Sequence, residues 1–376
     1  MVMEKIVINK AEIYKIKLPL QKPFRTGFGE LKDREIVFVK LYDKISGLWG
    51  LGETANLELP IYEPEFNDGS ILLLKNYLLP NLIGKVLGSI EDLELFYSNI
   101  RGNNFAKVGI EAAYWHLVSQ IKNKPLRKLW GGIKNLIPVG ISIGMGTDLK
   151  DSISRVVNYI DTFKPERAKI KIKPGIDVKL IEAIRNQYSN LPLTVDANAS
   201  FSPIDEKIFL KLDNYNLTMI EQPYAFNDLV NHSILQKKIK TPICLDESIN
   251  SLAVAEQAIA LESCKIINIK PQRIGGYWTA KKLSELAERN NIKVWCGGMI
   301  ESGWGQLFNS HIASLPNFVY ENDICLTKWY LADDILEKEI PEKDGYIDLE
   351  KTDNLFVINK TKFKKYQTLN IEINNR

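Results

Sequence analysis

The chain has 376 residues, of which 45% are hydrophobic and 25% charged, and its formal net charge is +3. These values are typical of a globular protein with a sizeable core, and the length suggests two or three structural units or one large barrel with additions. The small charge excess is not concentrated in one block, which argues against a nucleic-acid-binding protein.

The cysteines and the N-terminal sequence predict a cytoplasmic protein. Cys244, Cys264, Cys296 and Cys325 are scattered and form no CxxC pair. A disulfide framework or a zinc ribbon is therefore not expected, and a reducing compartment fits best. The first 20 residues carry charges every few positions and lack the apolar core of a signal peptide. No uninterrupted apolar stretch approaches about 18 residues, so we expect no membrane-spanning helix.

The N-terminal third of the chain predicts an α+β domain. Apolar and β-branched runs over 5–18 and 35–43 indicate antiparallel strands, and the stretches 70–84 and 105–124 indicate helices.

From Val139 onward, short strand-like runs alternate with helix-like segments. The runs are 139–145, 168–174, 191–198, 218–223, 242–248, 266–271 and 293–302. This alternation predicts βα units with parallel strands. After about Leu331 the pattern changes to short strands and turns, and we expect this tail to return to the N-terminal domain.

Five charged residues recur near the ends of successive predicted strands, namely Lys171, Asp196, Glu221, Asp246 and Lys270. Neighbouring members are 25, 25, 25 and 24 residues apart, about the length of one βα unit. Such positions converge at one mouth of a closed barrel, whereas an open doubly wound sheet spreads them along a row. No glycine-rich phosphate fingerprint follows the first strand, which also favours the barrel.

The three carboxylates Asp196, Glu221 and Asp246 predict a metal site. Three negative charges crowded at one mouth repel one another unless a cation neutralises them. A ligand set made only of oxygen suits Mg²⁺ or Mn²⁺ better than Zn²⁺. The alternative is that each carboxylate pairs with a surface Lys or Arg, which is expected for an isolated carboxylate rather than for three at equal spacing.

Lysines face the same mouth from two walls. Lys169 and Lys171 point to one side of their strand, and Lys270 comes from the opposite wall. An exposed strand with a basic face is the alternative, which the alternating isoleucines weaken. A metal ion flanked by lysines suits proton abstraction next to a carboxylate, because the metal stabilises the enediolate and one lysine moves the proton. A Schiff-base lysine leaves the carboxylates unexplained.

Other residues near the mouth give weaker signals. Asn198 can reach the metal or a substrate, and Glu247 is expected to face away from Asp246, as a supporting hydrogen-bond partner or in a structural role. The adjacent glycines in 297–302 let backbone amides approach a substrate or permit a turn. None of the three histidines follows a barrel strand, so histidine base catalysis is not expected.

Six barrel motifs resemble the enolase superfamily, and within it the o-succinylbenzoate synthase / N-acylamino acid racemase family. They are AKIKIKPG (168–175), VDANAS (195–200), IEQP (220–223), TPICLDESI (241–249), INIKPQRIGG (267–276) and WCGGMIESG (295–303). Segments 23–30, 52–69 and 106–117 of the N-terminal domain are similar to the same family. The resemblance covers nearly the whole chain, and the ordered set of motifs is specific.

The resemblance implies a modified TIM barrel, (β/α)7β, under an N-terminal α+β capping domain that the C-terminal tail completes. We expect the cap at 1–128, the barrel at 129–328 and the returning segment at 329–376. It implies that the metal ligands are Asp196, Glu221 and Asp246. It further implies that Lys171 is the acid/base beside Lys169, with Lys270 on the opposite face of the substrate.

The resemblance also implies substrate contacts. In the barrel these are Ser142, Asn198 and Ile300; in the cap they are Phe24, Leu57 and Tyr62; and Trp329 closes the pocket from the C-terminal side.

The activity expected from the resemblance is the Mg²⁺-dependent (or Mn²⁺-dependent) o-succinylbenzoate synthase reaction of menaquinone biosynthesis. This reaction is a syn dehydration of 2-succinyl-6-hydroxy-2,4-cyclohexadiene-1-carboxylate. The alternative is an N-acylamino acid (N-succinylamino acid) racemase with the same lysines and metal, and a non-catalytic barrel that binds a ligand is a third reading. The ESG after GGMI argues against a dipeptide epimerase. We expect a small-molecule carboxylate substrate, no nucleic-acid or membrane partner, and a homo-oligomer.

Overall fold

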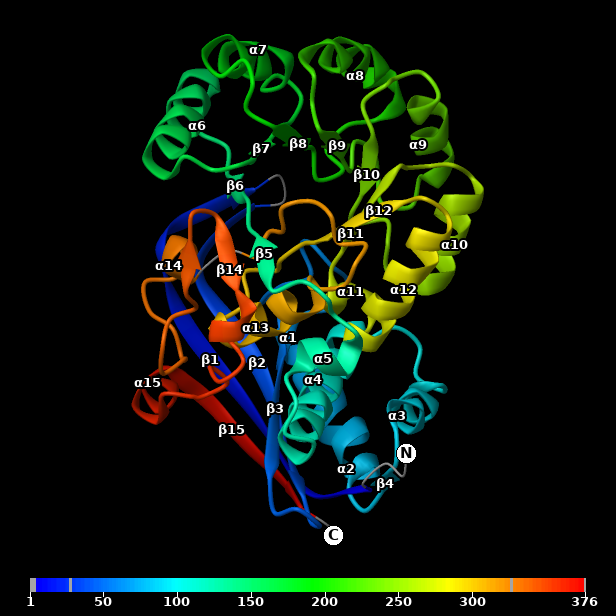
Figure 1. Ribbon diagram of the computed structural model, residues 1–376, viewed down its shortest axis with the longest axis vertical. Coiled ribbons are helices and arrows are strands. Elements are labelled where there is room, and N and C mark those ends of the chain that lie inside the picture. The colour runs from blue at the N-terminus through cyan, green and yellow to red at the C-terminus, as the bar shows by residue number, and fades with distance from the viewer. Residues whose placement is uncertain (1–4, 27–28, 325–326, 375–376) are drawn as a thin grey trace.

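An antiparallel sheet forms the base of the cap (Figure 1). The computed structural model describes residues 5–26, 29–324 and 327–374. Its cap strands are β1 (Ile6–Thr26), β2 (Gly29–Asp43), β3 (Trp49–Thr54), β4 (Val86–Leu87) and β15 (Gln367–Asn374), in the order β15-β1-β2-β3 with β4 paired to β1. Because β15 pairs with β1 in antiparallel register, the C-terminal tail completes the cap sheet, as the resemblance implied.

Helices pack against the cap sheet. The central one is α4 (Asn104–Ile121), which is buried along most of its length and contacts β2 and β3. Gly52 permits this close approach, since a Cβ there would lie 2.0 Å from the carbonyl oxygen of Gly109. The other helices of this region are α1 (Asn67–Leu73), the π-helical turn Leu74–Leu78, α2 (Leu79–Leu82), α3 (Ile90–Tyr97) and α5 (Leu126–Trp130).

Seven parallel strands form the second sheet, in the order β12-β11-β10-β9-β8-β7-β6. They are β6 (Ile141–Ile143), β7 (Ala168–Lys171), β8 (Leu193–Asp196), β9 (Met219–Glu221), β10 (Ile243–Leu245), β11 (Ile266–Ile269) and β12 (Lys293–Cys296). Each lies inside one of the seven predicted runs. Every residue of β7 to β11 is buried, as expected for strands covered on both faces.

Residues 318–323 close this sheet into a barrel. The amide of Val319 donates to the carbonyl of Val294 in β12 (3.0 Å), and the amide of Gly140, next to β6, donates to the carbonyl of Asn322 (2.9 Å). This segment is therefore the eighth stave of the barrel, and the prediction of a closed barrel is confirmed.

Helices surround the barrel strands (Figure 1). They are α6 (Leu149–Phe163), α7 (Val178–Gln187), α8 (Glu206–Leu212), α9 (Leu229–Gln236), α10 (Leu252–Ala260), α11 (Pro271–Ile274), α12 (Tyr277–Arg289) and α13 (Gly303–Ile312), with 3-10 turns at Pro203–Asp205 and Asp213–Tyr215. The three histidines lie on α4, α9 and α13, and all are buried away from the strand ends.

The tail runs across the side of the barrel before it reaches the cap. It contains α14 (Thr327–Tyr330), β13 (Glu342–Lys343), β14 (Tyr346–Asp348), the 3-10 turn Leu349–Lys351 and α15 (Lys360–Tyr366). Strand β14 pairs with β13 and with β5 (Leu136–Pro138), the segment that leads into the first barrel strand. The tail therefore contacts the barrel as well as the cap.

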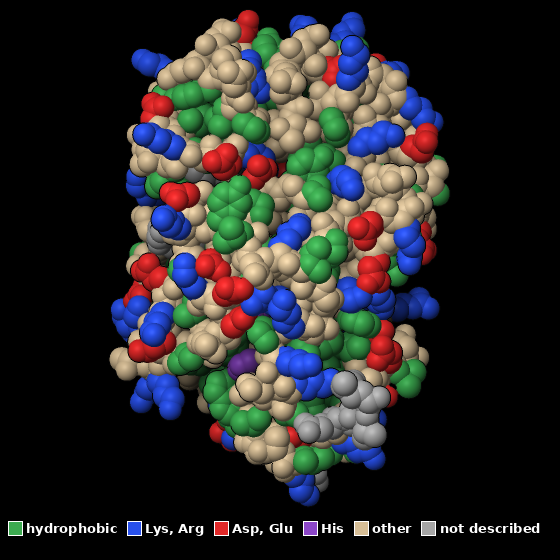
Figure 2. Space-filling view, viewed as in Figure 1, with side chains coloured by type: hydrophobic (Ala, Val, Ile, Leu, Met, Phe, Trp, Pro, Cys, Tyr) green, Lys and Arg blue, Asp and Glu red, His purple; other side chains and the backbone are tan. Residues whose placement is uncertain are grey.

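Charged side chains of both signs are interspersed over the face in Figure 2, without a block of one sign. In the described part of the chain, no helix has the length and apolar character needed to cross a bilayer. Self-association into a homo-oligomer stays a prediction.

Buried polar groups join the cap to the barrel. Glu111 of α4 accepts hydrogen bonds from the amide of Trp278 in the first turn of α12 (2.8 Å) and from Nε1 of Trp115 (3.2 Å). The free amides at a helix N-terminus favour a carboxylate there. Gly276 leaves the necessary space, since a Cβ there would lie 1.8 Å from the Glu111 carboxylate. Burial nevertheless raises the pKa of Glu111 to about 7.

The raised pKa of Glu111 predicts a dependence of stability on pH. An acid with a raised pKa binds its proton more tightly in the folded state, so its stabilising contribution is full below the unfolded pKa and is lost as the pH rises through about 7. We expect the free energy of unfolding to fall mainly between about pH 4.5 and about pH 7, and to fall less in Glu111→Gln. Urea titrations across this range measure the slope. The exposed Glu182→Gln is the control, and an equal slope change in both variants would contradict the assignment.

Candidate active site

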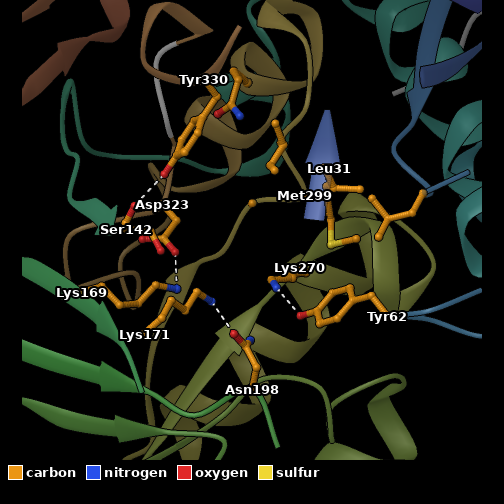
Figure 3. A pocket seen from close by; sticks show the side chains of 14 residues that line it. Leu31, Tyr62, Ser142, Lys169, Lys171, Asn198, Lys270, Met299, Asp323 and Tyr330 are labelled. Atoms are coloured by element: carbon orange, nitrogen blue, oxygen red, sulfur yellow. Dashed lines mark hydrogen bonds and ion pairs between the residues drawn. The ribbon is translucent and has the colours of Figure 1, made fainter. Parts of the chain in front are cut away.

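A pocket opens at the C-terminal ends of the barrel strands, and the cap forms part of its wall (Figure 3). The described residues that line it are Leu31, Leu57 and Tyr62 from the cap, Ser142, Lys169, Lys171, Asn198, Lys270, Gly298, Met299, Ile300, Gln306 and Asp323 from the barrel, and Tyr330 from the tail.

The three predicted carboxylates lie on adjacent strands below this pocket. Asp196 ends β8 and is the register partner of Glu221, which ends β9, and Asp246 follows β10 directly. Each is at most 1% exposed. Burial and the charge of Asp196 raise the pKa of Glu221 well above its usual range. Against the effect of burial, Lys171 and Lys169 lower the pKa of Asp196.

Lys169 is the central cation of the site. Its Nζ lies 3.3 Å from Oδ2 of Asp196 and 3.2 Å from Oε2 of Glu221, and it also pairs with Asp323 (Figure 3). Its ammonium group lies 4.8 Å from the centroid of the Trp295 ring. Although burial opposes the charged form, the three carboxylates raise the pKa of Lys169 well above its usual value. Lys169 is therefore a fixed positive charge rather than a base at neutral pH.

Lys171 lines the pocket and is held there by a chain of hydrogen bonds. Its Nζ donates to Oδ2 of Asp196 (2.6 Å) and to Oδ1 of Asn198 (2.7 Å). Nδ2 of Asn198 donates in turn to Oε1 of Glu247 (2.8 Å). Glu247 is buried, which raises its pKa to about 7. The structure thus places Glu247 behind Asn198, where it fixes the orientation of the amide that holds Lys171.

Lys270 is held by a second group of charges on the opposite side. Its Nζ donates to Oδ2 of Asp246 (2.9 Å) and to the hydroxyl of Tyr62 (2.8 Å). Arg273, which is fully buried, donates to Oδ1 of Asp246 (2.5 Å), to the Tyr62 hydroxyl (2.7 Å) and to Glu63. Against the effect of burial, Arg273 and Lys270 lower the pKa of Asp246. A cap residue, Tyr62, therefore fixes a lysine of the barrel.

The two lysines approach the pocket from opposite walls. Lys171 ends β7 and Lys270 follows β11, which is four strands farther along the sheet, and Figure 3 shows the pocket between them. A flat group bound between them presents one face to each amine. Such a site can remove a proton from one face of a carbon atom and return it to the same face or to the other.

The buried carboxylates fit a hard divalent cation. Their donor atoms are all oxygen, and Oε2 of Glu221 is buried and accepts no hydrogen bond, although it lies in an ion pair 3.2 Å from Nζ of Lys169. In the described part of the chain no three His, Cys, Asp or Glu side chains are drawn together as a metal centre. The oxygens of Asp196 and Asp246 instead accept hydrogen bonds from Lys171 and Lys270.

Five residues predicted to contact substrate line the pocket, namely Ser142, Asn198, Ile300, Leu57 and Tyr62. The side chain of Phe24 lies outside the described residues. The prediction that Trp329 closes the pocket is wrong. Its ring packs on Phe163, with the centroids 4.1 Å apart, and Trp329 lines a separate cavity beside α6. Its neighbour Tyr330 takes the predicted place and donates to the carbonyl of Ser142 (2.9 Å).

Two charged residues of the site, Asp323 and Arg273, were not predicted from the sequence. Asp323 ends the eighth stave, 27 residues after the end of β12 at Cys296. One further βα unit after Cys296 therefore predicts the end of an eighth strand near this position, but not its charge, since Cys296 itself is uncharged. Arg273 lies one helical turn after Lys270, and its position next to a predicted catalytic lysine was the available signal.

Models of known families match both parts of the chain. Residues 151–353 match the model described as enolase C-terminal domain-like, and residues 9–131 match the N-terminal domain of mandelate racemase / muconate lactonizing enzyme.

Curated proteins of similar sequence have two names. The o-succinylbenzoate synthase of Bacillus subtilis (strain 168) is 37% identical, over 96% of this chain and 97% of its own. The N-succinylamino acid racemase of Thermus thermophilus is 35% identical, also over 96% of this chain and 97% of its own. Among solved structures, an enolase-superfamily member from Listeria innocua superposes with a TM-score of 0.92 at 35% identity, covering 98% of this chain and 99% of that chain.

The carboxylates predict a measurable cation affinity. We expect Glu221→Gln to weaken Mg²⁺ and Mn²⁺ binding by about 100-fold, because the amide keeps the shape of the side chain but removes one negative ligand. Isothermal titration calorimetry measures the affinity. Glu247→Gln is the matched control, since Glu247 is also a buried carboxylate but faces Asn198. Equal losses in the two variants would contradict the ligand assignment.

Proposed function

The chain belongs to the enolase superfamily, and from that membership and the geometry of the site we propose that it catalyses the o-succinylbenzoate synthase reaction. The substrate is then 2-succinyl-6-hydroxy-2,4-cyclohexadiene-1-carboxylate, which loses water by syn elimination. Enzymes of the superfamily use a divalent metal, and the oxygen ligand set favours Mg²⁺, with Mn²⁺ as the substitute.

The observation that carries this proposal is the pair of lysines on opposite walls of one pocket, above three buried carboxylates. The acidic proton in the substrate lies on the carbon next to a carboxylate, and its removal leaves an enediolate with two negative charges. A site for this reaction needs a base on one face, positive charge around the carboxylate and little water. Lys171 is placed to act as the base, and Lys169 and Lys270 supply positive charge in a largely buried site.

Lys171 performs both proton transfers in the proposed mechanism. Its neutral amine takes the proton from the carbon atom that carries the carboxylate. The electron pair released then expels the hydroxyl group on the same face, and the Lys171 ammonium gives its proton to the departing oxygen. Water leaves, the ring becomes aromatic, and Lys171 returns to the neutral amine. Asn198 holds Nζ of Lys171 in place.

The other charges stabilise the enediolate. Lys270 stays protonated on the opposite face, and Lys169 stays charged beside the carboxylates. Asp196, Glu221 and Asp246 would hold a divalent cation, which when bound would supply further positive charge near the substrate carboxylate.

Racemisation of N-succinylamino acids is the second candidate function. The observation that favours it is the near symmetry of the two lysines, each of which donates to one of the buried aspartates. In this reaction one lysine takes the α-proton from one face, and the other lysine gives a proton to the opposite face. A relative at 35% identity is named N-succinylamino acid racemase.

The experiment that tests the proposal is conversion of the dehydration substrate by the purified protein, first with Mg²⁺ and then with chelator. We expect fast conversion that the chelator abolishes and that added metal restores. No conversion by protein that binds the metal would sink the synthase proposal and leave the racemase as the candidate.

Charge-preserving lysine variants separate the two reactions. Arginine keeps the positive charge but does not become a neutral base at neutral pH, so it cannot take the proton from the substrate. We expect Lys171→Arg to lower kcat for both reactions by about 1000-fold, and Lys270→Arg to do so for racemisation while it lowers dehydration by about tenfold. Stopped-flow absorbance and chiral chromatography measure the two rates. The exposed Lys173→Arg is the control on the same chain segment. Equal losses of both reactions in Lys270→Arg would refute its charge-only role in dehydration.

A further inference from the structure

Arg34 is a buried cation of the cap that none of the catalytic steps uses. It lies in β2, is 1% exposed, and directs its guanidinium group at backbone carbonyls. Nε donates to Ile300 (3.0 Å), Nη2 to Ala55 (2.6 Å), and Nη1 to Glu35 (2.5 Å) and to Asn56. Within the described residues no carboxylate forms an ion pair with it. A buried charge whose direct hydrogen bonds go to carbonyls, with carboxylates such as Glu53 and Glu301 only nearby, is costly to bury, so its position calls for a reason.

The carbonyls that Arg34 holds belong to two walls of the reaction pocket. Ala55 and Asn56 directly precede Leu57, which lines the pocket from the cap. Ile300 lines it from the barrel, in the loop after β12. One side chain therefore ties a cap segment and a barrel loop, which are far apart in the sequence, into a single frame around the substrate.

The barrel loop needs such a restraint. Ile300 has a φ of 57°, a left-handed conformation that is unfavourable for a β-branched residue. Conformations of this kind persist only where the surroundings hold them, and they are concentrated at functional sites. The hydrogen bond from Arg34 to the Ile300 carbonyl is one restraint supplied by the cap; Glu53 of β3, which accepts hydrogen bonds from the amide (3.1 Å) and the hydroxyl of Ser302, is another.

A guanidinium group is suited to this task and an ammonium group is not. Arginine presents its donors in a rigid planar fork, whereas lysine has one nitrogen at the end of a flexible chain. A lysine at this position keeps the charge near Glu53 and Glu301, yet it cannot reach carbonyls from three segments at once. The conservative substitution therefore separates the geometric role from the charge.

We propose that Arg34 is a positioning residue that fixes the two walls of the substrate pocket and thereby sets substrate affinity. The proposal rests on the proposed function for its substrate, but not for its geometry. Arg34 lies outside the proton-transfer groups, so its loss acts on binding more than on chemistry.

The test compares Arg34→Lys with Arg185→Lys. Arg185, on α7, also donates to backbone carbonyls, including Leu191 (2.8 Å) and Tyr215 (3.0 Å), but it does not line the pocket. We expect Arg34→Lys to raise KM for the dehydration substrate by about tenfold with kcat changed less than about threefold. We expect Arg185→Lys to lower the melting temperature and to leave KM unchanged. An unchanged KM in folded Arg34→Lys, or an equal rise in both variants, overturns the proposal.

Hydrogen exchange of the wild-type protein provides a second test that needs no variant and no turnover. Two segments tied by one side chain open together, so we expect peptides covering 54–58 and 298–302 to show the same protection. Clearly different protection in the two peptides overturns the role of Arg34. A wild-type protein that does not convert the dehydration substrate contradicts the proposed function instead, and the exchange result still decides the inference.

Discussion

The contact of Lys169 with Asp196, Glu221 and Asp323 is the interaction on which the arrangement of the site depends. Charges inside a barrel are costly unless they are paired and hydrogen-bonded. Lys169 neutralises part of a buried carboxylate cluster and cannot leave it. The second lysine of the strand, Lys171, points into the pocket and contacts one carboxylate, that of Asp196, and the amide of Asn198.

The same balance extends across the mouth of the barrel. Asp246 is shared by Lys270 and Arg273, and Arg273 is also paired with Glu63 of the cap. The cap thus contributes to the charge balance as well as to the shape of the pocket. Groups such as Glu111 and Arg34 attach the cap to the barrel, so residues of both form the wall of the pocket.

Much of this arrangement could be predicted because the barrel repeats. The spacing of about 25 residues placed the charged strand ends Lys171, Asp196 and Glu221 at register-matched positions, as the pairing of β7, β8 and β9 shows. The seven runs were recognisable as strands because short stretches rich in apolar residues alternate with helix-like segments at a regular spacing. The family motifs added the cap and its completion by the tail.

The features that could not be predicted from the sequence depend on contacts between segments that are distant in the chain. The eighth stave at 318–323 is held by few backbone bonds and follows a helix without a clear strand pattern, so Asp323 was not identified. The choice between Trp329 and Tyr330 depends on how a short helix is rotated, which neighbouring aromatic residues do not reveal. The role of Arg34 depends on hydrogen bonds to backbone carbonyls. Every residue has such a carbonyl, so the sequence does not indicate which ones face the guanidinium group.

A crystal structure with Mn²⁺ and o-succinylbenzoate is the measurement that tests the central claim most directly, because the anomalous signal of manganese locates the cation. The account predicts that the cation binds Asp196, Glu221 and Asp246. It also predicts that the ring of the product lies between Lys171 and Lys270, with the carboxylate on the ring, not that of the succinyl chain, toward the metal. A cation held by other residues, or a product bound with both lysines on one face of its ring, would contradict the account.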